Sequence, residues 1–376
     1  MDCGIKAIDK VSYAQTLGID FIICDHHLPG KAVPDALAIL DPKQPDCSYP
    51  FKDLCGCGIG FKLIHALTQQ KGGVIEDILP FVDLVAMAIA ADIVPMVGEN
   101  RILTHFGIQQ IHQNPRLGIR FFINEFKRKI NVSDLVFVIA PRINGAGRIK
   151  HGSHAVALLL SEEKEEALSR ARAIELFNSE RKELDQKITA QALDQIKQNQ
   201  EEELYSTVVF QPDWHKGVVG IVASRLIETH YRPTVVFAAS GDYYTGSVRS
   251  VKGVDVYQIL EACKAHIVQF GGHRYAAGLT IKAEDYLPFK KAFELAVAQS
   301  IHPEQRLPST SYDLEMTLDK ISPKFHRIMT QMAPFGPGNM RPVFLTKNCL
   351  DGGGSRAVGA DQNHLKLDVI DDSKSK

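Results

Sequence analysis

The chain has 376 residues, 45% of them hydrophobic, and a formal net charge of −1 at pH 7. This length predicts two or three domains with a sizeable core, and the near-neutral charge excludes a protein that is basic over its whole surface. No apolar run reaches the ~18 residues of a transmembrane helix, and the first residues do not resemble a secretion signal, so we expect a cytoplasmic protein. The seven cysteines lack the spacing of a disulfide framework, and we expect reduced thiols.

The first part of the chain, residues 1–150, predicts alternating strands and helices. Apolar spacing predicts a helix that ends at Gly18, and then a short buried strand over 21–24. Further helices are expected around 63–67 and over 80–91, and the latter is apolar nearly all round, which predicts that it is buried. Strands that alternate with helices are typical of a mainly parallel sheet.

The next segment, residues 161–203, contains neither Gly nor Pro. Apolar side chains recur in it at helical spacing, while Glu, Lys and Arg fill much of the remainder. The segment therefore predicts one long helix whose polar faces are solvated and which connects two domains. The apolar positions are Phe177, Leu184, Ile188, Ala192 and Ile196.

After this helix the chain predicts a second, smaller α/β domain and a β-rich module. The runs YSTVVF and PTVVFAA are typical of strands, and VVGIVASRLIE between them is typical of a helix. The alternating run HLKLDVI near the end also predicts strands, so the predicted fold class is α/β throughout. The expected divisions are a first domain over 1–154, the connecting helix over 155–204, the second domain over 205–304, and the β-rich module over 308–376.

A cluster of acids and imidazoles is expected in the first domain. Asp25, His26 and His27 directly follow a predicted strand, where open parallel sheets place their ligands. Asp2 and Asp92 lie in loops of the same kind, and such a mixed site suits Mn²⁺ or Mg²⁺ better than a structural zinc, which prefers thiolates. The alternative is that the acids cap turns and helices and that the histidines are solvated. Adjacent histidines behind a buried strand favour the metal site.

The stretch PRINGAGRIKHGSH is a candidate phosphate-binding segment. Arg142 and Arg148 can each donate two hydrogen bonds to a phosphate, with Asn144 between them. The glycines at 145 and 147 let a backbone approach a ligand closely. A tight turn whose arginines pair with acids explains the same pattern equally well.

Three stretches of the second domain have the composition of anion-binding loops. GSVRS and GGHR combine glycines with hydroxyl, guanidinium and imidazole groups, which favours a backbone cradle for phosphate. In WHKGVVGIVASR, two glycines flank a predicted helix start behind a histidine, but the G-x-G-x-x-G spacing of a dinucleotide site is absent. The candidate residues are His215, Gly217, Gly220, Ser247, Arg249, Ser250, Gly271, Gly272 and His273.

Taken together, these motifs resemble the DHH phosphoesterase superfamily and, within it, the RecJ family of single-strand-specific DNA exonucleases. DHH alone would indicate only the superfamily, whereas RINGAGR and PFGPGN indicate RecJ. The segments that carry the resemblance extend over nearly the whole chain: MDCGIKA, GIDFIICDHHLPG, ADIVPMVGENR, PRINGAGRI, WHKGVVGIVASR, GSVRS, GGHRYAAGLTI and PFGPGNMRPVF.

The resemblance implies a role for each residue of the acidic cluster. Asp2 would bridge two divalent ions, Mn²⁺ or Mg²⁺, and His26 and Asp92 would be ligands of one of them. His27 would face the scissile phosphate, and Asp25 would orient an imidazole from the second shell. The reaction would be two-metal hydrolysis of a phosphodiester bond.

The resemblance also implies the substrate and the partners. Arg249 and His273 would grip the DNA backbone, in a DHH-associated domain, and the last region would be an OB fold that binds single strands. The implied function is 5′→3′ exonuclease activity on single-stranded DNA in repair and recombination. A single-strand-binding protein and a helicase would be further partners, the protein would be a monomer, and no membrane is implied.

The chain departs from this family at its start, because the family's first motif supplies two aspartates upstream of Asp2. We therefore expect an N-terminally truncated form with an incomplete two-metal site, impaired activity and a partial OB-like module. Two other functions stay open. One is a hydrolase of short oligonucleotides or nucleotide phosphates, and the other is a non-catalytic fragment that binds single-stranded DNA.

Overall fold

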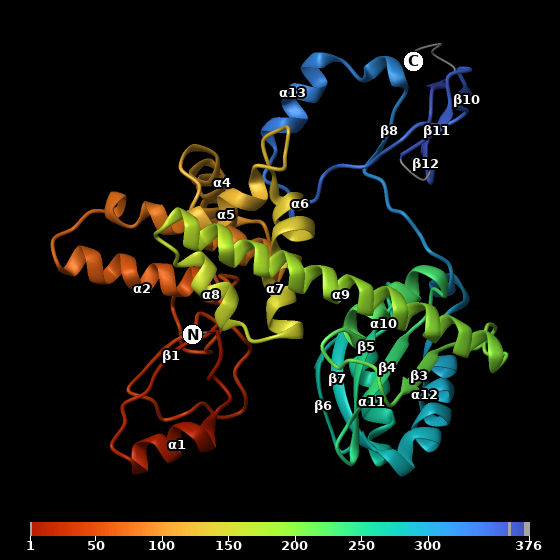
Figure 1. Ribbon diagram of the computed structural model, residues 1–376, viewed down its shortest axis with the longest axis horizontal. Coiled ribbons are helices and arrows are strands. Elements are labelled where there is room, and N and C mark those ends of the chain that lie inside the picture. Colours follow the sequence, from red (N-terminus) through yellow and green to blue (C-terminus); the bar gives the residue numbers. More distant parts are fainter. Residues whose placement is uncertain (1, 360–361, 372–376) are drawn as a thin grey trace. The chain divides into compact units, whose positions relative to one another are not determined.

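The structure is a computed structural model that describes residues 2–359 and 362–371 (Figure 1). The chain divides into two compact units. The first unit covers residues 1–141, 161–167 and 311–376, and the second covers 142–160 and 168–310. Among the described helices, none is both long and apolar enough to cross a membrane.

The first unit begins with a small parallel sheet and continues mainly as helices. Ile22 of one strand lies opposite Ala38 of the other, in parallel register. The predicted parallel pairing is thus present, but the described residues up to 141 form only this two-stranded sheet, because the longer apolar helices pack on one another. The elements are α1 (Ile8–Thr16), β1 (Ile22–Cys24), β2 (Ala38–Leu40), α2 (Gly56–Gln70), α3 (Val82–Asp92), α4 (Gly98–Gln113), α5 (Leu117–Ile123), α6 (Val132–Asp134), a π-helical segment (Leu135–Ile139) and the start of α7 (Ala140–Ile149).

Helix α3 is the buried centre of this unit, as its uniform apolarity predicted. Most of its side chains are buried, including that of Asp83, which pairs with Arg116 at 3.0 Å. Helix α4 crosses it closely, because Gly107 has no side chain: a Cβ there would lie 2.4 Å from the Cβ of Ala86. Asp92 is the last residue of α3.

The second unit is built around a five-stranded sheet in the order β3-β4-β5-β7-β6. The first two strands are parallel, as a β-α-β connection requires, and the others are antiparallel. The strands are β3 (Thr207–Gln211), β4 (Thr234–Ser240), β5 (Tyr243–Arg249), β6 (Gln269–His273) and β7 (Ala276–Lys282). The helices are α8 (Ser153–Leu159), α9 (Lys164–Gln198), α10 (Val219–Thr229), α11 (Val256–Ala262) and α12 (Tyr286–Ser300).

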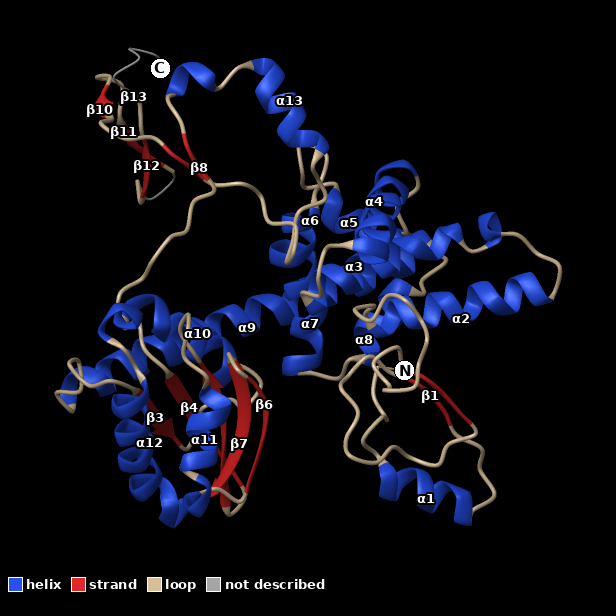
Figure 2. Ribbon diagram, turned by 180° about the vertical axis from the view of Figure 1, so that it is seen from behind, coloured by secondary structure: helices blue, strands red, loops and turns tan. Residues whose placement is uncertain are grey.

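Helices cover both faces of this sheet (Figure 2). Neighbouring residues of a strand point to opposite faces, so Val209 packs against α9 and α10 while Val208 packs against α11 and α12. Burial on both faces explains why YSTVVF and PTVVFAA are nearly continuous apolar runs.

Helix α9 confirms the predicted long helix, but not its predicted solvation. Asn178, Arg181 and Asp185 are 1%, 8% and 0% exposed, so a row of polar side chains is buried along one side. Within it, Asp185 accepts a hydrogen bond of 2.7 Å from Arg225 of α10. Spacing alone shows where a helix carries polar groups, but not which of them a neighbouring helix covers.

The last region is rich in short strands, as predicted, and it packs against the start of α4. The backbone N–H of Met96 donates to the carbonyl of Pro337, and Arg101 donates to that of Met332. The elements are β8 (Leu314–Glu315), α13 (Pro323–Gln331), β9 (Phe344–Leu345), β10 (Leu350–Asp351), β11 (Arg356–Val358), β12 (His364–Lys366) and β13 (Val369–Ile370). Residues 372–376 of the predicted module lie outside the described residues.

Because the polar side chains along one side of α9 are buried, we expect one substitution there to lower stability strongly. Asp185→Ala leaves the guanidinium of Arg181 buried without its carboxylate, which should lower the free energy of unfolding by about 3 kcal/mol. Chemical denaturation measures this, with Asp194→Ala, an exposed acid on the same helix, as the control. Equal stability of the two variants would contradict the assigned charge pairing.

Candidate functional site

His26 lies at the centre of a group of carboxylates. Its Nε2 is 3.1 Å from Oδ1 of Asp2 and 3.4 Å from Oδ2 of Asp92. His26 is buried, whereas both carboxylates remain open to solvent. Ligand atoms of Asp2, His26 and His27 all lie within 4.8 Å of one another. The structure therefore brings together the residues that the sequence had singled out around DHH, from three separate segments.

The loop geometry that presents Asp2 depends on a glycine. The N–H of Asp2 donates to the carbonyl of Cys24 at 2.7 Å, which fixes the loop beside β1. The Asp2 side chain rests against Gly56, the first residue of α2, where a Cβ would lie 2.3 Å from Oδ1. A carboxylate at a helix N-terminus is also electrostatically favoured. Gly56 was not among the residues predicted from the sequence, because no pattern around it indicates a contact with Asp2.

The chain reverses direction immediately after Asp92. Asp92 is the last residue of α3, and Ile93 adopts a left-handed conformation with φ of 57°. A β-branched residue rarely adopts this conformation, and such strain is concentrated at functional loops.

Asp25 organises the other half of the cluster and is itself 1% exposed. Its Oδ2 accepts a hydrogen bond from the N–H of Ile5, and its Oδ1 accepts from the backbone of His26 and His27. Burial opposes ionisation, but these hydrogen bonds outweigh it and lower the pKa of Asp25 to about 2. The carboxylate is therefore charged at neutral pH.

The imidazole that Asp25 orients is His27, not the central His26. Nδ1 of His27 lies 2.7 Å from Oδ1 of Asp25, which leaves Nε2 of His27 directed away from the carboxylate. Nδ1 of His26 is buried and has no hydrogen-bond partner among the described residues. The two adjacent imidazoles are thus held in different ways.

The residues present fit a divalent cation. Asp2, Asp25 and Asp92 carry negative charge around His26, and no ion pair with Lys or Arg is described for any of them. Carboxylates with one imidazole are a donor set for Mn²⁺ or Mg²⁺. A cation between Asp2, His26 and Asp92 would relieve the repulsion between the carboxylates, whereas a structural zinc would require thiolates.

Asn100 ties together the two loops that support the cluster. Its side chain is fully buried, and Nδ2 donates to the carbonyls of Asp53, at 2.6 Å, and Pro95, at 2.9 Å. One loop follows Asp92 and the other precedes Gly56, so the amide couples the positions of two carboxylates. The sequence reasoning quoted VGENR without assigning this role, because the second bonded loop lies 47 residues away.

The second unit gathers its candidate phosphate-binding groups at the start of α10. Arg249 donates to Oγ of Ser247 at 3.0 Å, and a Cβ on Gly220 would lie 2.9 Å from both side chains. Burial, together with the like charge of Arg148, lowers the pKa of Arg249. Arg148 in turn donates to the carbonyl of Gly217 at 3.2 Å. These cationic groups surround a helix N-terminus, which favours anions.

His215 completes this group and shapes its loop. Its Nδ1 accepts a hydrogen bond of 3.1 Å from the N–H of Gly217, two residues further on. The ring therefore lies against the backbone that precedes α10, beside Arg148.

PRINGAGRI forms helix α7, so the tight turn of the alternative interpretation is absent from these described residues. Gly145 faces α9, where a Cβ would lie 3.7 Å from Cα of Asn178, so the glycine serves helix packing. Arg142 pairs with Glu175 at 2.6 Å, in agreement with the alternative that its arginines bind acids. Asn144 is exposed on the same helix.

GGHR lies in a strand rather than in a backbone cradle. Gly271 and His273 belong to β6 and pair with Gly278 and Ala276 of β7, so their backbone groups face the ladder. Ser250 also differs from the expectation, because its hydroxyl donates to the carbonyl of Val254 at 2.9 Å. Antiparallel pairing with β7, the next strand along the chain, determines the conformation of Gly271 and Gly272.

Three family models match the chain. The DHH family N-terminal domain matches residues 1–89, the DHHA1 domain matches 202–299, and the RecJ OB domain matches 312–376. The single-stranded-DNA-specific exonuclease RecJ of Haemophilus influenzae is 33% identical over 388 residues, which cover 98% of this chain and 67% of that protein. The chain belongs to the RecJ family. The predicted family and the α/β fold class are thereby confirmed.

Other RecJ proteins are longer than the aligned region. RecJ of Bacillus subtilis is 36% identical over 378 residues, covering 99% of this chain and 47% of the relative. The chain thus spans about half the length of that curated relative.

Solved RecJ structures share the fold. A crystal structure of RecJ from Thermus thermophilus in complex with Mn²⁺ matches with a TM-score of 0.83 at 28% identity, covering 97% of this chain and 54% of that one. A second RecJ structure, bound to manganese, matches with a TM-score of 0.67 at 30% identity, covering 81% and 76%. Both relatives hold a divalent ion of the kind that the donor set around His26 suits.

From the two hydrogen bonds of Asn100 we expect that its substitution lowers both stability and metal binding. Asn100→Leu removes both donors and leaves two carbonyls unpaired, which should lower the free energy of unfolding by about 2 kcal/mol and weaken Mn²⁺ binding. Denaturation and the electron paramagnetic resonance signal of free Mn²⁺ measure the two effects. Asn114→Leu, at the exposed end of α4, is the control. Unchanged Mn²⁺ affinity in the folded variant would refute the coupling.

Asp25 predicts a specific pH dependence of stability. Because its pKa falls from 3.8 to about 2 on folding, the ionised carboxylate stabilises the fold above pH 3.8, and this contribution disappears as the pH falls through about 2. The stability difference between the wild type and Asp25→Asn should therefore be full at neutral pH and narrow at acid pH. Denaturant titrations along a pH series measure it, with the exposed Asp20→Asn as the control. A constant difference would be inconsistent with the lowered pKa.

Proposed function

We propose that this chain is the core of a metal-dependent exonuclease that hydrolyses phosphodiester bonds of single-stranded DNA in the 5′→3′ direction. The observation that carries the proposal is the convergence of Asp2, His26 and Asp92 beside His27, an imidazole anchored by Asp25. Family membership supports it, since the relatives carry the name single-stranded-DNA-specific exonuclease.

Each residue of the cluster has a distinct role in this proposal. Asp2, His26 and Asp92 hold the divalent ions, which, when bound, supply an activated water and neutralise charge on the phosphate. His27 presents Nε2 to a phosphate oxygen, because Nδ1 is engaged by Asp25. The Asp25 carboxylate bonds Nδ1 of that ring and so fixes its orientation.

The second unit binds the phosphate backbone in this proposal. Arg249, Ser247 and Arg148 lie around the N-terminus of α10 and offer charge-assisted hydrogen bonds. We place Arg142 and Asn144 on the same substrate-binding unit, with Arg142 held by Glu175. His215, Ser250 and residues 271–273 stay candidate contacts.

Several wider aspects belong to the same proposal. We infer a role in DNA repair and recombination in the cytoplasm, as a monomer, with a single-strand-binding protein and a helicase as partners. The proposed domains are 1–154, 155–204, 205–304 and 308–376. We also infer impaired activity of this chain alone, because the described ligand-bearing residues next to His26 are Asp2, His27 and Asp92, fewer than two ions require.

Activity on labelled single strands tests the proposal. With Mn²⁺, this chain and a version extended to the length of its relatives should both release nucleotides from the 5′ end, the extended version faster. His27→Ala in the extended version should lower kcat at least a hundredfold, and Arg249→Ala should raise KM at least tenfold. His65→Ala, a histidine on α2, is the matched control.

The alternatives have their own outcomes. Cleavage of dinucleotides only, with long strands ignored, would favour a hydrolase of short substrates. Tight, salt-sensitive binding of single strands that is unaffected by chelators, without hydrolysis by either version, would favour a non-catalytic DNA-binding protein.

A further inference from the structure

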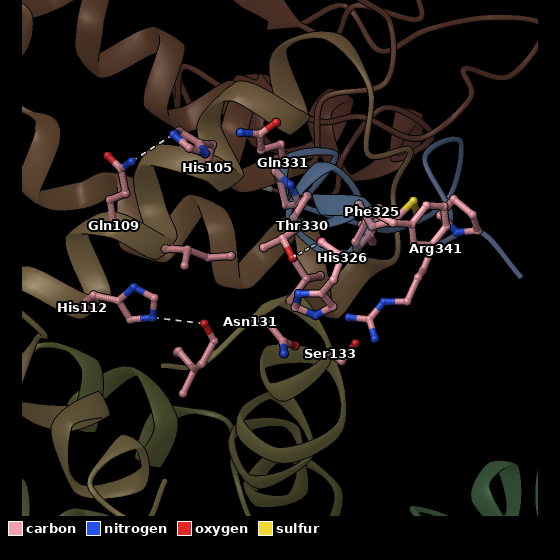
Figure 3. Close-up of a pocket in the computed structure, with 18 of the residues that line it drawn as sticks. His105, Gln109, His112, Asn131, Ser133, Phe325, His326, Thr330, Gln331 and Arg341 are labelled. Carbon is pink, nitrogen blue, oxygen red and sulfur yellow. Dashed lines mark hydrogen bonds between the residues drawn. The ribbon is translucent and has the colours of Figure 1, made fainter. Parts of the chain in front are cut away.

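A cavity of about 830 Å³ lies in the first unit, among residues that form no part of the metal cluster (Figure 3). Its walls come from three segments, residues 105–112 of α4, residues 130–133, and residues 321–344 around α13. This volume is within the range of sites for small molecules and cofactors.

The apolar part of the cavity contains aromatic rings. Phe325 of α13 meets Phe344 edge-on, with ring centroids 5.4 Å apart. The guanidinium of Arg341 lies 5.4 Å from the ring centroid of Phe335. Ile108 and Val132 line the wall with them. Partly exposed aromatic rings are groups on which single-strand-binding proteins stack nucleobases.

Among the described residues, no acidic side chain lines the polar part of the cavity. Its lining contains Arg341 and three histidines but no Asp or Glu. His112 is bonded to the carbonyl of Ile130 and His105 to Gln109, so these rings are engaged. Figure 3 shows the side chains of Arg341 and His326, from the segment around α13, and of Ser133, from residues 130–133, directed toward one another.

These three side chains are donors without an acceptor. No hydrogen bond or ion pair within the described part of the chain engages the guanidinium of Arg341, the ring of His326 or the hydroxyl of Ser133. A guanidinium, an imidazole and a hydroxyl directed at one place are complementary to a phosphate or carboxylate group.

Hydrogen bonds hold the wall of the cavity in place. Asn339 donates to the carbonyls of Met332, at 3.0 Å, and Pro334, at 2.8 Å. Arg101 of α4 donates to the carbonyl of Met332, so this wall is fixed to the opposite side. Asn339 belongs to the motif PFGPGN, which the metal centre does not involve. These hydrogen bonds preorganise the wall of the cavity.

We propose that this cavity binds one nucleotide, with the base against Phe325 and Phe344 and the phosphate at Arg341, His326 and Ser133. The inference rests on the proposed function and extends it, because it assigns a nucleotide subsite separate from the metal centre. The shared chemistry is a nucleoside 5′-phosphate. It can come from an internal position of the single strand or from the mononucleotide that hydrolysis releases.

Binding measured in EDTA tests the subsite without the metal centre. Thymidine 5′-phosphate, thymidine and inorganic phosphate are titrated by calorimetry against this chain, and a labelled oligothymidylate by fluorescence anisotropy. We expect the nucleotide to bind at least tenfold more tightly than thymidine or phosphate. Arg341→Ala and Phe344→Leu should each weaken its binding at least tenfold, the latter because it keeps apolar volume but loses the ring.

Arg327→Ala, an exposed arginine on α13 outside the cavity, should bind as the wild type does. Loss of oligothymidylate binding in the cavity variants identifies the strand as the source. Loss of mononucleotide binding alone identifies the released mononucleotide as the source. Wild-type binding of both ligands by both variants would overturn the proposal, as would tighter binding of an acidic aromatic peptide than of the nucleotide.

The two proposals fail in distinguishable ways. His27→Ala should leave nucleotide binding in EDTA unchanged, because the ring lies outside the cavity. Absence of Mn²⁺-dependent hydrolysis by the extended version, with binding retained, would reject the exonuclease function alone. Hydrolysis by the extended version, with wild-type binding of both ligands in Arg341→Ala and Phe344→Leu, would reject the subsite alone.

Discussion

Repulsion between carboxylates around one buried imidazole is the constraint on which the first unit depends. Asp2, Asp25 and Asp92 come from different segments and are held close to His26 and His27 without a basic partner among the described residues. Two features make this arrangement of carboxylates possible. Gly56 has no side chain and so leaves room for Asp2, and hydrogen bonds stabilise the charged carboxylate of Asp25. The energy spent on this arrangement is recovered when a divalent cation binds, so the scaffold is built for a metal.

The second unit instead gathers positive charge, carried by arginines. Arg148, Arg181 and Arg249 crowd the region of α7, α9 and α10, and burial lowers the pKa of the last two. Asp185 is the buried acid that compensates part of this charge. The remaining guanidiniums can offer charge-assisted hydrogen bonds to a polyanion, as the proposed phosphodiester substrate requires. One chain thus carries a cluster of carboxylates that a cation would stabilise and a group of guanidiniums that an anion would stabilise.

The proposed nucleotide subsite is made by contacts between distant segments. Asn339 and Arg101 fix the wall formed by residues 332–344 against α4 and leave a cavity with aromatic rings and unpaired donors. Its lining combines segments more than 200 residues apart, so no short sequence pattern predicts the cavity. A nucleotide there would contact residues of both the α4 region and the β-rich module, which makes the subsite a property of their packing.

The family, the α/β class, the buried helix α3 and the cluster around His26 could all be predicted from the sequence. These follow from short patterns, because strand ends and helix periodicity are local properties. The tertiary structure was needed to show that Asp25 holds His27, that Asn100 couples two loops, and that α9 buries Asp185. It also showed that PRINGAGRI is a helix packed against α9. The physical reason is that burial and hydrogen-bond partners depend on segments far apart in the chain.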